Sequence, residues 1–419
     1  MYYKKLKALI SVLVAAVILC TAVPFSSAAV REYTYCDLDG NGHADAADAR
    51  AALRFSVDLD HYTKGHLEQC GIAERFSAAD ARFILRLAVG LESTEATSVS
   101  ISDEAFSQYV NKPSEDELFR WEIPEEPEID APSGTFTFTV YGYGHGVGLS
   151  QYGALSLEDG GYTYDRILSH YYTGTEIRQI EEFPEFTLYP TLTYSEELGY
   201  ETYVKTEQPT AELLARIVYQ EIYGVTKQGK YRESLKAMTL CIFSNLVSYD
   251  FDVSSRWDVG VASSLSYEEL PENLKELVNE VLGQYITVKG ETEPILAVYS
   301  GLAAGMTASS EDIWGGYLSY LTAVPSPFDM QREGFITTYT YTVDEMRKKI
   351  LAYDESITLS DDPAQWLEIL SHNASMDENR GYVTEIRVGD KVLRGYNQFH
   401  MGLMGNVHRS SCFTITYTP

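Results

Sequence analysis

The hydrophobic and polar positions of the 419-residue chain divide it into three stretches. At 49–57 and 81–90 apolar residues recur with the helical period, which predicts two short amphipathic helices. Residues 93–133 are rich in Ser, Glu, Asp and Pro and have no regular period, which predicts a solvated, extended linker. From 134 to 419 strand and helix patterns return, and we expect one domain there.

This last stretch mixes the two periods without strict alternation, which favours an α+β fold over a doubly wound parallel sheet. Strands are predicted at Thr135–Tyr141, Phe186–Tyr194, Tyr285–Lys289, Pro294–Tyr299, Val383–Val388 and Phe413–Tyr417. Helices are predicted at Leu149–Leu157, Tyr164–Tyr172, Thr210–Tyr223, Arg232–Tyr249 and Asn273–Leu282. The protein is therefore predicted to be multidomain, with a small helical unit followed by a larger α+β domain.

The first 29 residues have the pattern of a secretory signal peptide. Three lysines precede the apolar run Ala8–Cys20, and Ser27-Ala28-Ala29 offers small residues for cleavage. Leu19 is too large for the residue before a lipidated cysteine, so lipidation at Cys20 is not expected. No later stretch approaches the length of a membrane span. We therefore expect a protein that is secreted, or held at the cell surface by a scaffold, with no transmembrane segment after signal removal.

The charge balance is strongly acidic and limits the classes of partner. The chain has 32 basic and 61 acidic residues, a net charge of −29. Such a surface repels phosphate backbones, so nucleic acid is not an expected partner. It also repels anionic cell-wall polymers at long range. Solubility of a secreted protein accounts for the same charge without any specific partner.

A five-residue sequence occurs twice near the N-terminus. Ala-Ala-Asp-Ala-Arg stands at 46–50 and again at 78–82, each time at the start of a predicted helix and after a cysteine. Export permits disulfides, and the four cysteines outside the signal allow three pairings. No cysteine or histidine cluster with zinc spacing is present. The four cysteines are Cys36, Cys70, Cys241 and Cys412.

The first copy follows a loop that fits the calcium-loop template. Oxygen-bearing side chains occupy its first, third, fifth and twelfth positions, and Gly42 stands at the sixth, where the chain turns sharply. The main-chain carbonyl at the seventh position and a water would complete the shell of a hard cation. A turn rich in Asp and Gly that binds nothing is the alternative. The predicted calcium ligands are Asp37, Asp39, Asn41, His43 and Asp48.

A calcium loop followed by a helix, twice over, resembles the dockerin family, over residues 36–92. The resemblance implies an EF-hand-like, all-α module at 30–92 that binds a cohesin module of a cellulosome scaffoldin. The second copy departs from the pattern, because Gln69 stands where its first aspartate is expected, and we expect no calcium there. Cys36 and Cys70 open the two repeats. They are predicted either to form a disulfide or to be two buried free thiols.

The second motif is glycine-rich. Gly142–Ala154 reads Gly-Tyr-Gly-His-Gly-Val-Gly-Leu-Ser-Gln-Tyr-Gly-Ala, and Tyr164–Gly174 follows it. Closely spaced glycines hold a backbone in conformations that other residues do not tolerate, and here they present one imidazole and one amide. That arrangement suits a polar ligand in a groove, although a tight strand-to-helix turn would need glycines as well.

These residues resemble the family of stage II sporulation protein D and the amidase enhancers (LytB-like), whose members act on peptidoglycan. Leu214–Glu221, Glu233–Ala237 and Tyr299–Thr307 agree with further segments of that family. The resemblance covers most of 135–330, and the order is permuted, since the glycine string normally closes the domain and here opens it. A fold whose ends lie side by side tolerates such a change.

The resemblance implies a lytic transglycosylase, which cleaves peptide-free glycan strands and leaves an anhydro-sugar. Glu221 matches the catalytic glutamate, and one carboxyl with a raised pKa can act as both acid and base. Lys236, His145 and Gln151 are the implied sugar-binding residues, with His170 as a further candidate. The alternative for Glu221 is a surface carboxylate at a helix end. The zinc ligands of some members have no match, so no zinc is predicted.

Three departures from the family pattern bear on catalysis. Phe243 stands at the position of a usual arginine, Ser300 at that of a histidine, and Ala304 at that of a glycine. The first two remove polar or charged groups that could stabilise a transition state. One alternative is therefore a non-catalytic module that binds the cell wall or enhances an amidase. A plant-polysaccharide enzyme is another, although most glycosidases use two carboxylates and only one is matched here.

Overall fold

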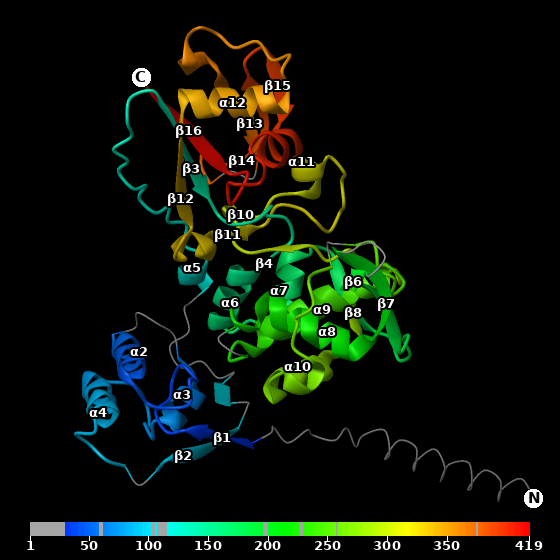
Figure 1. Ribbon diagram of the computed structural model, residues 1–419. Coiled ribbons are helices and arrows are strands. Elements are labelled where there is room, and N and C mark those ends of the chain that lie inside the picture. The colour runs from blue at the N-terminus through cyan, green and yellow to red at the C-terminus, as the bar shows by residue number, and fades with distance from the viewer. Residues whose placement is uncertain are drawn as a thin grey trace, which may run out of the picture. The chain divides into compact units, whose positions relative to one another are not determined.

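The computed structural model describes residues 30–57, 62–94, 96–102, 105–106, 115–195, 200–226, 229–256, 259–373 and 376–419 (Figure 1). The chain splits into two compact units, one reaching Val110 and the other beginning at Asn111. Within the described residues, no helix has both the length and the apolar character needed to span a bilayer. The predicted signal peptide, residues 1–29, lies outside them.

The described residues of the smaller unit form the helices α2 (Ala46–Ser56), α3 (Lys64–Gln69) and α4 (Ala78–Ala88). Each begins at a side chain that accepts a hydrogen bond from the first turn, which satisfies main-chain donors that a helix start leaves free. The equivalent helices α2 and α4 pack together over a core that includes Phe55 and Ile84. Both helices expected from the repeats are present and begin three residues earlier than predicted.

The smaller unit also contains two strands, so it is not all-α as predicted. β1 (Val30–Thr34) pairs antiparallel with β2 (Ser98–Ser102), inside the segment expected to be a linker. The sequence Ser-Val-Ser-Ile-Ser alternates with the period of a strand, and its Ile101 is buried in a small cluster with Phe106. High polarity concealed this alternation, because only two of the five residues are apolar.

The larger unit is α+β, as predicted. One of its sheets has the order β12-β3-β16, all antiparallel. The middle strand, β3 (Thr135–Tyr141), is buried along its whole length, between β12 (Ile336–Thr342) and β16 (Phe413–Thr418). The Gly134 amide donates to the Thr418 carbonyl oxygen at 2.8 Å. The first and last strands of this unit therefore lie side by side.

A second sheet packs near the first, with the order β13-β14-β15 (Leu367–Asn373, Tyr382–Val388 and Lys391–Arg394). A π-helix at Gly395–Leu403 contacts β14 and β15, and helix α12 (Val343–Tyr353) contacts this π-helix and strands β3 and β12 of the first sheet. Their shared core includes Phe138, Trp366 and Phe399. Of this part, the patterns predicted only the strands at Thr135–Tyr141, Val383–Val388 and Phe413–Tyr417.

The other core of the larger unit is mainly helical, with α9 (Arg232–Ser248) at its centre. Twelve of the seventeen residues of α9 are buried, and Phe243 contacts the rings of Phe183 and Phe251. Phe243 therefore occupies the core, and no charged group enters the site from this position. Helices α6 (Gln151–Asp159), α7 (Tyr164–Tyr171), α8 (Thr210–Val218) and α10 (Glu272–Val281) surround α9.

Short strand pairs connect the helices. β4 (Leu149–Ser150) runs parallel to β9 (Tyr299–Ser300), and β5 (Thr175–Gln179) pairs antiparallel with β8 (Gln284–Val288). The strand expected at Pro294–Tyr299 is reduced to β9 and a single bridge at Pro294. The other α-helices and strands of the described residues are α5 (Glu115–Leu118), β6 (Phe186–Ser195), β7 (Tyr200–Pro209), β10 (Gly305–Met306), α11 (Ser310–Trp314) and β11 (Pro325–Ser326).

Part of the predicted linker packs on the larger unit. Phe119 contacts the rings of His170 and Phe328, and the Trp121 indole donates to the Met376 carbonyl oxygen at 3.0 Å. Glu126 accepts hydrogen bonds from Tyr141 and from Arg380, at 2.5 and 2.9 Å. These contacts hold the segment that precedes β3.

Candidate functional site

Glu221 lies where α8 changes its winding. The helix is α-helical to Val218 and continues as a π-helix over Tyr219–Tyr223. Single π-turns in helices occur frequently at functional sites, since they redirect one side chain. Glu221 is half-buried, and burial raises the pKa of its carboxyl above the usual range. This carboxyl therefore meets one requirement of an acid catalyst.

A loop at Val259–Ser263 lies against Glu221 and is fixed from several elements. The Val261 amide donates to Glu221 Oε1 at 3.4 Å. The Tyr189 hydroxyl, from β6, accepts from the Ala262 amide at 2.8 Å and donates to the Gly260 carbonyl oxygen at 3.3 Å. The Tyr299 hydroxyl donates to the Val259 carbonyl oxygen at 3.4 Å, and Arg216 donates twice to that of Ser263, at 3.0 and 2.6 Å.

Gly260 permits the close approach of this loop to the carboxyl. Its φ is +108°, and a Cβ there would lie 2.9 Å from Glu221 Oε1 and 2.9 Å from Ile217 Cγ2. Any other residue at this position would strain the backbone and move the glutamate.

Gly260→Ala is therefore expected to lower the thermal midpoint and to displace Glu221, with a loss of any activity that depends on it. The destabilisation should be on the order of 1–3 kcal/mol, the cost of a strained backbone position. Gly224→Ala is the control, because Gly224 has helical φ and ψ and no heavy atom near its Cβ position. Equal thermal midpoints for both variants would contradict the account of Gly260.

The glycine string lies beside this site. Gly148 has a φ of +75°, and a Cβ there would lie 1.9 Å from the Val298 carbonyl oxygen, so only glycine lets β4 lie against β9. Three residues further on, Gln151 begins α6, and its Nε2 donates to the Glu221 carbonyl oxygen at 3.5 Å. The structure thus brings together two of the predicted site residues, Gln151 and Glu221.

His145 lies in the same string and is held by main-chain groups. Its Nδ1 accepts from the Val147 amide at 3.0 Å, and the Tyr299 main chain also hydrogen-bonds the ring. Burial lowers the pKa of His145 to about 4, so the imidazole is neutral near pH 7. The Trp314 ring lies 5.1 Å away, centroid to centroid. His145 therefore joins the glycine string to β9 and offers no positive charge to a ligand.

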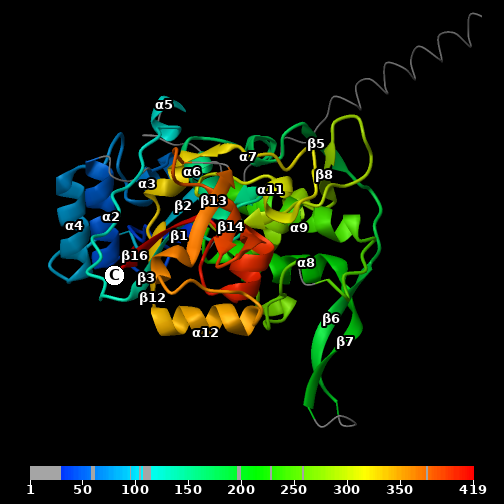
Figure 2. The ribbon, with the colours of Figure 1, turned by 90° about the horizontal axis from the view of Figure 1, so that it is seen from above.

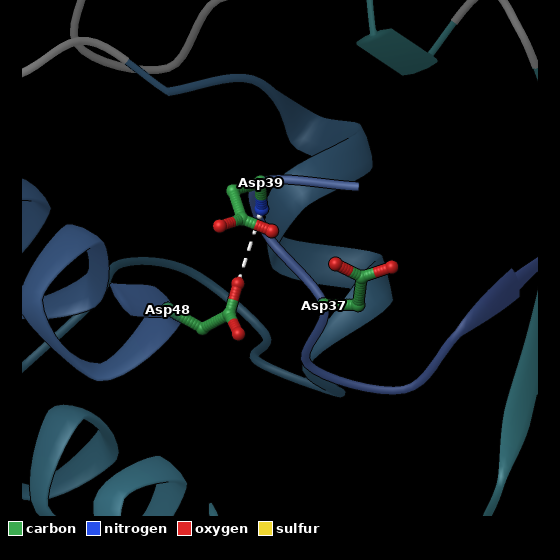
Figure 3. Close-up of side chains that lie close together, drawn as sticks. All are labelled: Asp37, Asp39 and Asp48. Carbon is green, nitrogen blue, oxygen red and sulfur yellow. Dashed lines mark hydrogen bonds between the residues drawn. The ribbon is translucent and has the colours of Figure 1, made fainter. Parts of the chain in front are cut away.

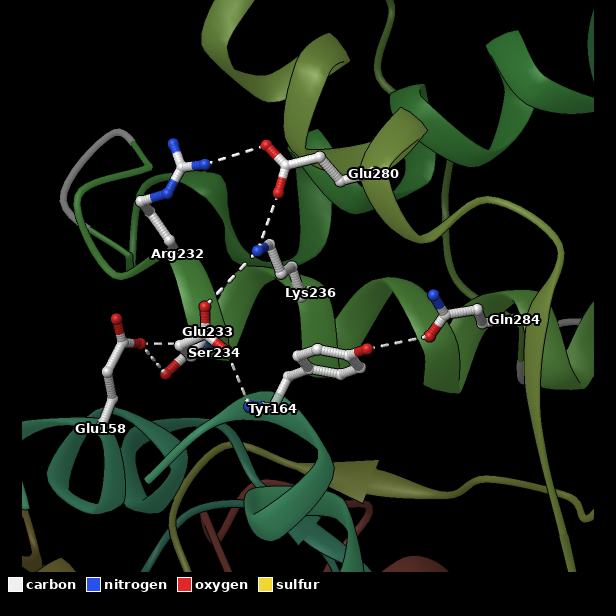
Figure 4. A network of polar contacts seen from close by, with 8 residues as sticks. All are labelled: Glu158, Tyr164, Arg232, Glu233, Ser234, Lys236, Glu280 and Gln284. Atoms are coloured by element: carbon white, nitrogen blue, oxygen red, sulfur yellow. Dashed lines mark hydrogen bonds and ion pairs between the residues drawn. The ribbon is translucent and has the colours of Figure 1, made fainter. Parts of the chain in front are cut away.

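Lys236 belongs to a separate polar network (Figure 4). Its Nζ lies 2.8 Å from Glu280 Oε2 and 3.5 Å from Glu233 Oε1, and Arg232 pairs with the same Glu280. These carboxylates neutralise the lysine, and none of its described contacts includes Glu221. The structure does not bring Lys236 to the Glu221 site.

His170 also lies apart from Glu221 in its described contacts. Its Nε2 is 2.8 Å from the Pro325 carbonyl oxygen, and its ring packs against Phe119 and Phe328. Burial lowers the pKa of His170 below the usual range. These contacts show that His170 packs against the segment that precedes β3.

Tyr189, Arg216 and the loop at 259–263 contact the site and were not identified from the sequence. The loop has no regular period, and Tyr189 reads only as a strand residue. Arg216 and Tyr299 stood in two of the quoted family segments, Leu214–Glu221 and Tyr299–Thr307, and these segments were the available signal.

In the smaller unit, three of the predicted calcium ligands converge (Figure 3). One carboxylate oxygen each of Asp37, Asp39 and Asp48 lies within 4.8 Å of the others. Asp48 Oδ1 accepts from the amides of Leu38 and Asp39, at 2.6 and 3.1 Å. Asp37 accepts from three amides, including that of Gly42 at 3.0 Å, and these bonds shape the loop.

Three carboxylates in one loop fit a hard cation such as calcium. Asn41 Nδ2 donates to Asp39 Oδ2 at 3.3 Å, and the His43 amide donates to Asn41 Oδ1 at 3.1 Å, so the remaining predicted ligands adjoin the cluster. Burial and the nearby Asp39 charge raise the pKa of Asp48, although main-chain donors oppose them. No second such cluster occurs in the part of the chain that the structure describes.

Gln69, at the equivalent position of the second copy, serves the first loop. Its Nε2 donates to the carbonyl oxygens of Asp37 and Thr34, the latter at 3.1 Å. Next to it, Cys70 and Cys36 are buried free thiols that hydrogen-bond to each other. Their position close together is compatible with either predicted state, and the disulfide stays a prediction.

Under oxidising conditions we expect Cys36 and Cys70 to form a disulfide. A bond between Cys36 and Cys70 closes a loop of the chain, which would stabilise the smaller unit by roughly 3–4 kcal/mol because it lowers the conformational entropy of the unfolded chain. Peptide mapping without reductant is the measurement, and the buried Cys241 and Cys412 are internal controls that should stay alkylatable after unfolding. Recovery of Cys36 and Cys70 as alkylated thiols would contradict the prediction.

Stage II sporulation protein D of Bacillus amyloliquefaciens is 46% identical to this chain over 80 residues. The match supports a stage II sporulation protein D-like domain. It covers 19% of this chain and 23% of that protein, so the chain spans about a quarter of the relative's length. No family model matches the chain. The dockerin resemblance has no comparable support and stays a prediction.

Proposed function

We propose that the stage II sporulation protein D-like domain acts on peptidoglycan glycan strands and cleaves them as a lytic transglycosylase, with Glu221 as acid and base. The observation that carries this proposal is the half-buried Glu221 at a π-turn, with a raised pKa and a loop amide on Oε1. Gln151 of the glycine string lies beside it. The similarity to stage II sporulation protein D supports a role at the cell wall, in sporulation or a related process.

In this mechanism protonated Glu221 gives its proton to the glycosidic oxygen as the bond to the sugar breaks. The carboxylate then takes the proton of that sugar's own hydroxyl, which closes the anhydro ring. The reaction consumes no water, and Glu221 ends protonated as it began. Burial favours the protonated acid, and the Val261 amide stabilises the carboxylate formed between the two steps.

A module that binds the cell wall or enhances an amidase without catalysis is the second candidate. It is favoured by Phe243, which lies in the core, and by Lys236, which is paired with carboxylates. Incubation with peptide-free glycan strands and mass spectrometry separates the two. Anhydro-ended products support cleavage, whereas binding without products supports the module. Digestion of xylan or cellulose would instead indicate a plant-polysaccharide enzyme.

For the smaller unit, we propose a secreted dockerin that binds one calcium ion and a cohesin module of a scaffoldin. The aspartate cluster supports the ion. Two apolar pairs at equivalent positions of the repeats support docking. Leu53 and Leu85 are 47% and 45% exposed, and Val57 and Val89 are 57% and 60% exposed. Both copies thus present the same apolar side chains, as expected of a surface for a protein partner.

The full chain should therefore bind a cohesin from the same organism in the presence of calcium, and chelation should abolish binding. Leu53→Asp with Leu85→Asp should weaken binding at least tenfold, measured by calorimetry, because it places charge in the apolar contact. Leu351→Asp, at an exposed apolar residue of the larger unit, is the control. Failure with every cohesin of that organism would contradict the dockerin proposal.

A further inference from the structure

The β6–β7 hairpin extends from the larger unit as a two-stranded ribbon (Figure 2). Cross-strand partners point to the same side of such a ribbon, and side chains alternate along each strand. Three neighbouring pairs on one side form what we call the threonine face: Tyr189, Thr191, Thr193, Thr202, Val204 and Thr206.

Hydrogen bonds agree with this assignment. The hydroxyls of Thr191 and Thr206 lie 2.6 Å apart, and Thr206 donates to the Tyr189 carbonyl oxygen at 3.4 Å. No residue of the threonine face is charged, whereas Glu201, Lys205 and Glu207 all lie on the opposite face. This separation gives the hairpin one uncharged face in a chain whose net charge is −29.

The threonine face begins at the candidate site. Tyr189 holds Gly260 and Ala262 through its hydroxyl, and Val261 between them donates to Glu221. From Tyr189 to Thr193 the strand advances about 13 Å at its usual rise per residue. Val204 is 40% exposed and Thr193 is exposed, while Thr191, Thr202 and Thr206 are half-buried. A polymer bound at Glu221 could therefore continue along accessible side chains.

We propose that the threonine face binds the continuation of a peptide-free glycan strand beyond the sugars at Glu221. Its hydroxyls can exchange hydrogen bonds with sugar hydroxyls, and Val204 can pack on the apolar face of a sugar ring. A peptide-free strand carries a lactyl carboxylate on each muramic residue, so the net charge of the chain repels it at long range. The threonine face places no carboxylate of its own beside the strand and is therefore a surface on which the strand can lie without close like-charge contacts. The inference depends on the proposed function in one respect only, which is that the strand is cleaved at Glu221.

The test measures equilibrium binding of long and short peptide-free glycan strands to the full chain, carrying Glu221→Gln to keep the strands intact. Thr193→Asp with Thr202→Asp changes one cross-strand pair of the threonine face. Leu192→Asp with Tyr203→Asp changes the neighbouring pair on the opposite face and adds the same charge. We expect the first variant to bind long strands at least tenfold more weakly, with unchanged affinity for short strands. The control should leave both affinities unchanged.

A neutral variant, Thr193→Ala with Thr202→Ala, should weaken long-strand binding at least threefold, without new charge. Long strands that bind no tighter than short ones, or equal losses in the two aspartate variants, would overturn the inference. Unchanged binding by the alanine variant would overturn it too, even if the wild-type protein forms anhydro products. If the threonine-face variants lose affinity for long strands while the wild-type protein forms no anhydro products, the inference is upheld and the proposed catalysis is contradicted.

Discussion

Replacing Glu221 by glutamine is expected to reduce cleavage of peptide-free glycan strands at least about a hundredfold, while strand binding persists. Glutamine keeps the size and polarity of the side chain but can neither give nor take the proton. The measurement is the rate at which anhydro-ended products appear, by mass spectrometry. Glu212→Gln, the same change in the first turn of α8, is the matched control and should leave the rate unchanged.

The pH dependence provides a second readout of the same group. The acid must be protonated to act, so the rate should fall as the pH rises through the raised pKa of Glu221. Gly260→Ala should alter this limb of the profile, because it displaces the carboxyl from the Val261 amide. Full activity in Glu221→Gln would show that another group moves the proton.

The second large effect concerns calcium. We expect calorimetry on the full chain to give one calcium ion per molecule, and Asp37→Ala with Asp48→Ala to abolish binding. These two carboxylates lie within 4.8 Å of each other and of Asp39, so their mutual repulsion favours a cation between them. Asp80→Asn, at the position of Asp48 in the second copy, keeps the helix cap and should leave the stoichiometry at one.

Calcium should also stabilise the smaller unit by mass action. An ion that binds only the folded state at a hundred times its dissociation constant contributes about 2.7 kcal/mol. Chelation should therefore lower the thermal midpoint of the smaller unit and leave that of the larger unit unchanged. Two bound ions, or none, would contradict the ligand assignment.

The elements that the sequence predicted well are those with a strong local period. The strand at Thr135–Tyr141 has the predicted bounds, and α9 begins at the predicted Arg232. α12 and β13 were missed because their burial comes from a second core that forms only when distant segments meet. The change to π-winding at Tyr219 has no signal in a pattern that fits an α-helix equally well.

The site could be predicted only in part for the same reason. Glu221 and Gln151 come from segments with a recognisable sequence, and the structure brings them together. Lys236 has an equally recognisable context, but its position on α9 turns it toward Glu233 and Glu280. Tyr189 contacts the site through tertiary hydrogen bonds alone, which no local pattern encodes.

The pairing of β3 with β16 has a consequence for folding. β3 is the first strand of the larger unit, all seven of its residues are buried, and its partner β16 is the last strand of the chain. β12 can pair with one edge of β3 as soon as Ile336–Thr342 is made, but the other edge stays open until Phe413–Thr418 follows. Such a strand is a site of aggregation until it is paired. Deleting Phe413–Thr418 should therefore leave a protein that is synthesised normally but collects in insoluble aggregates.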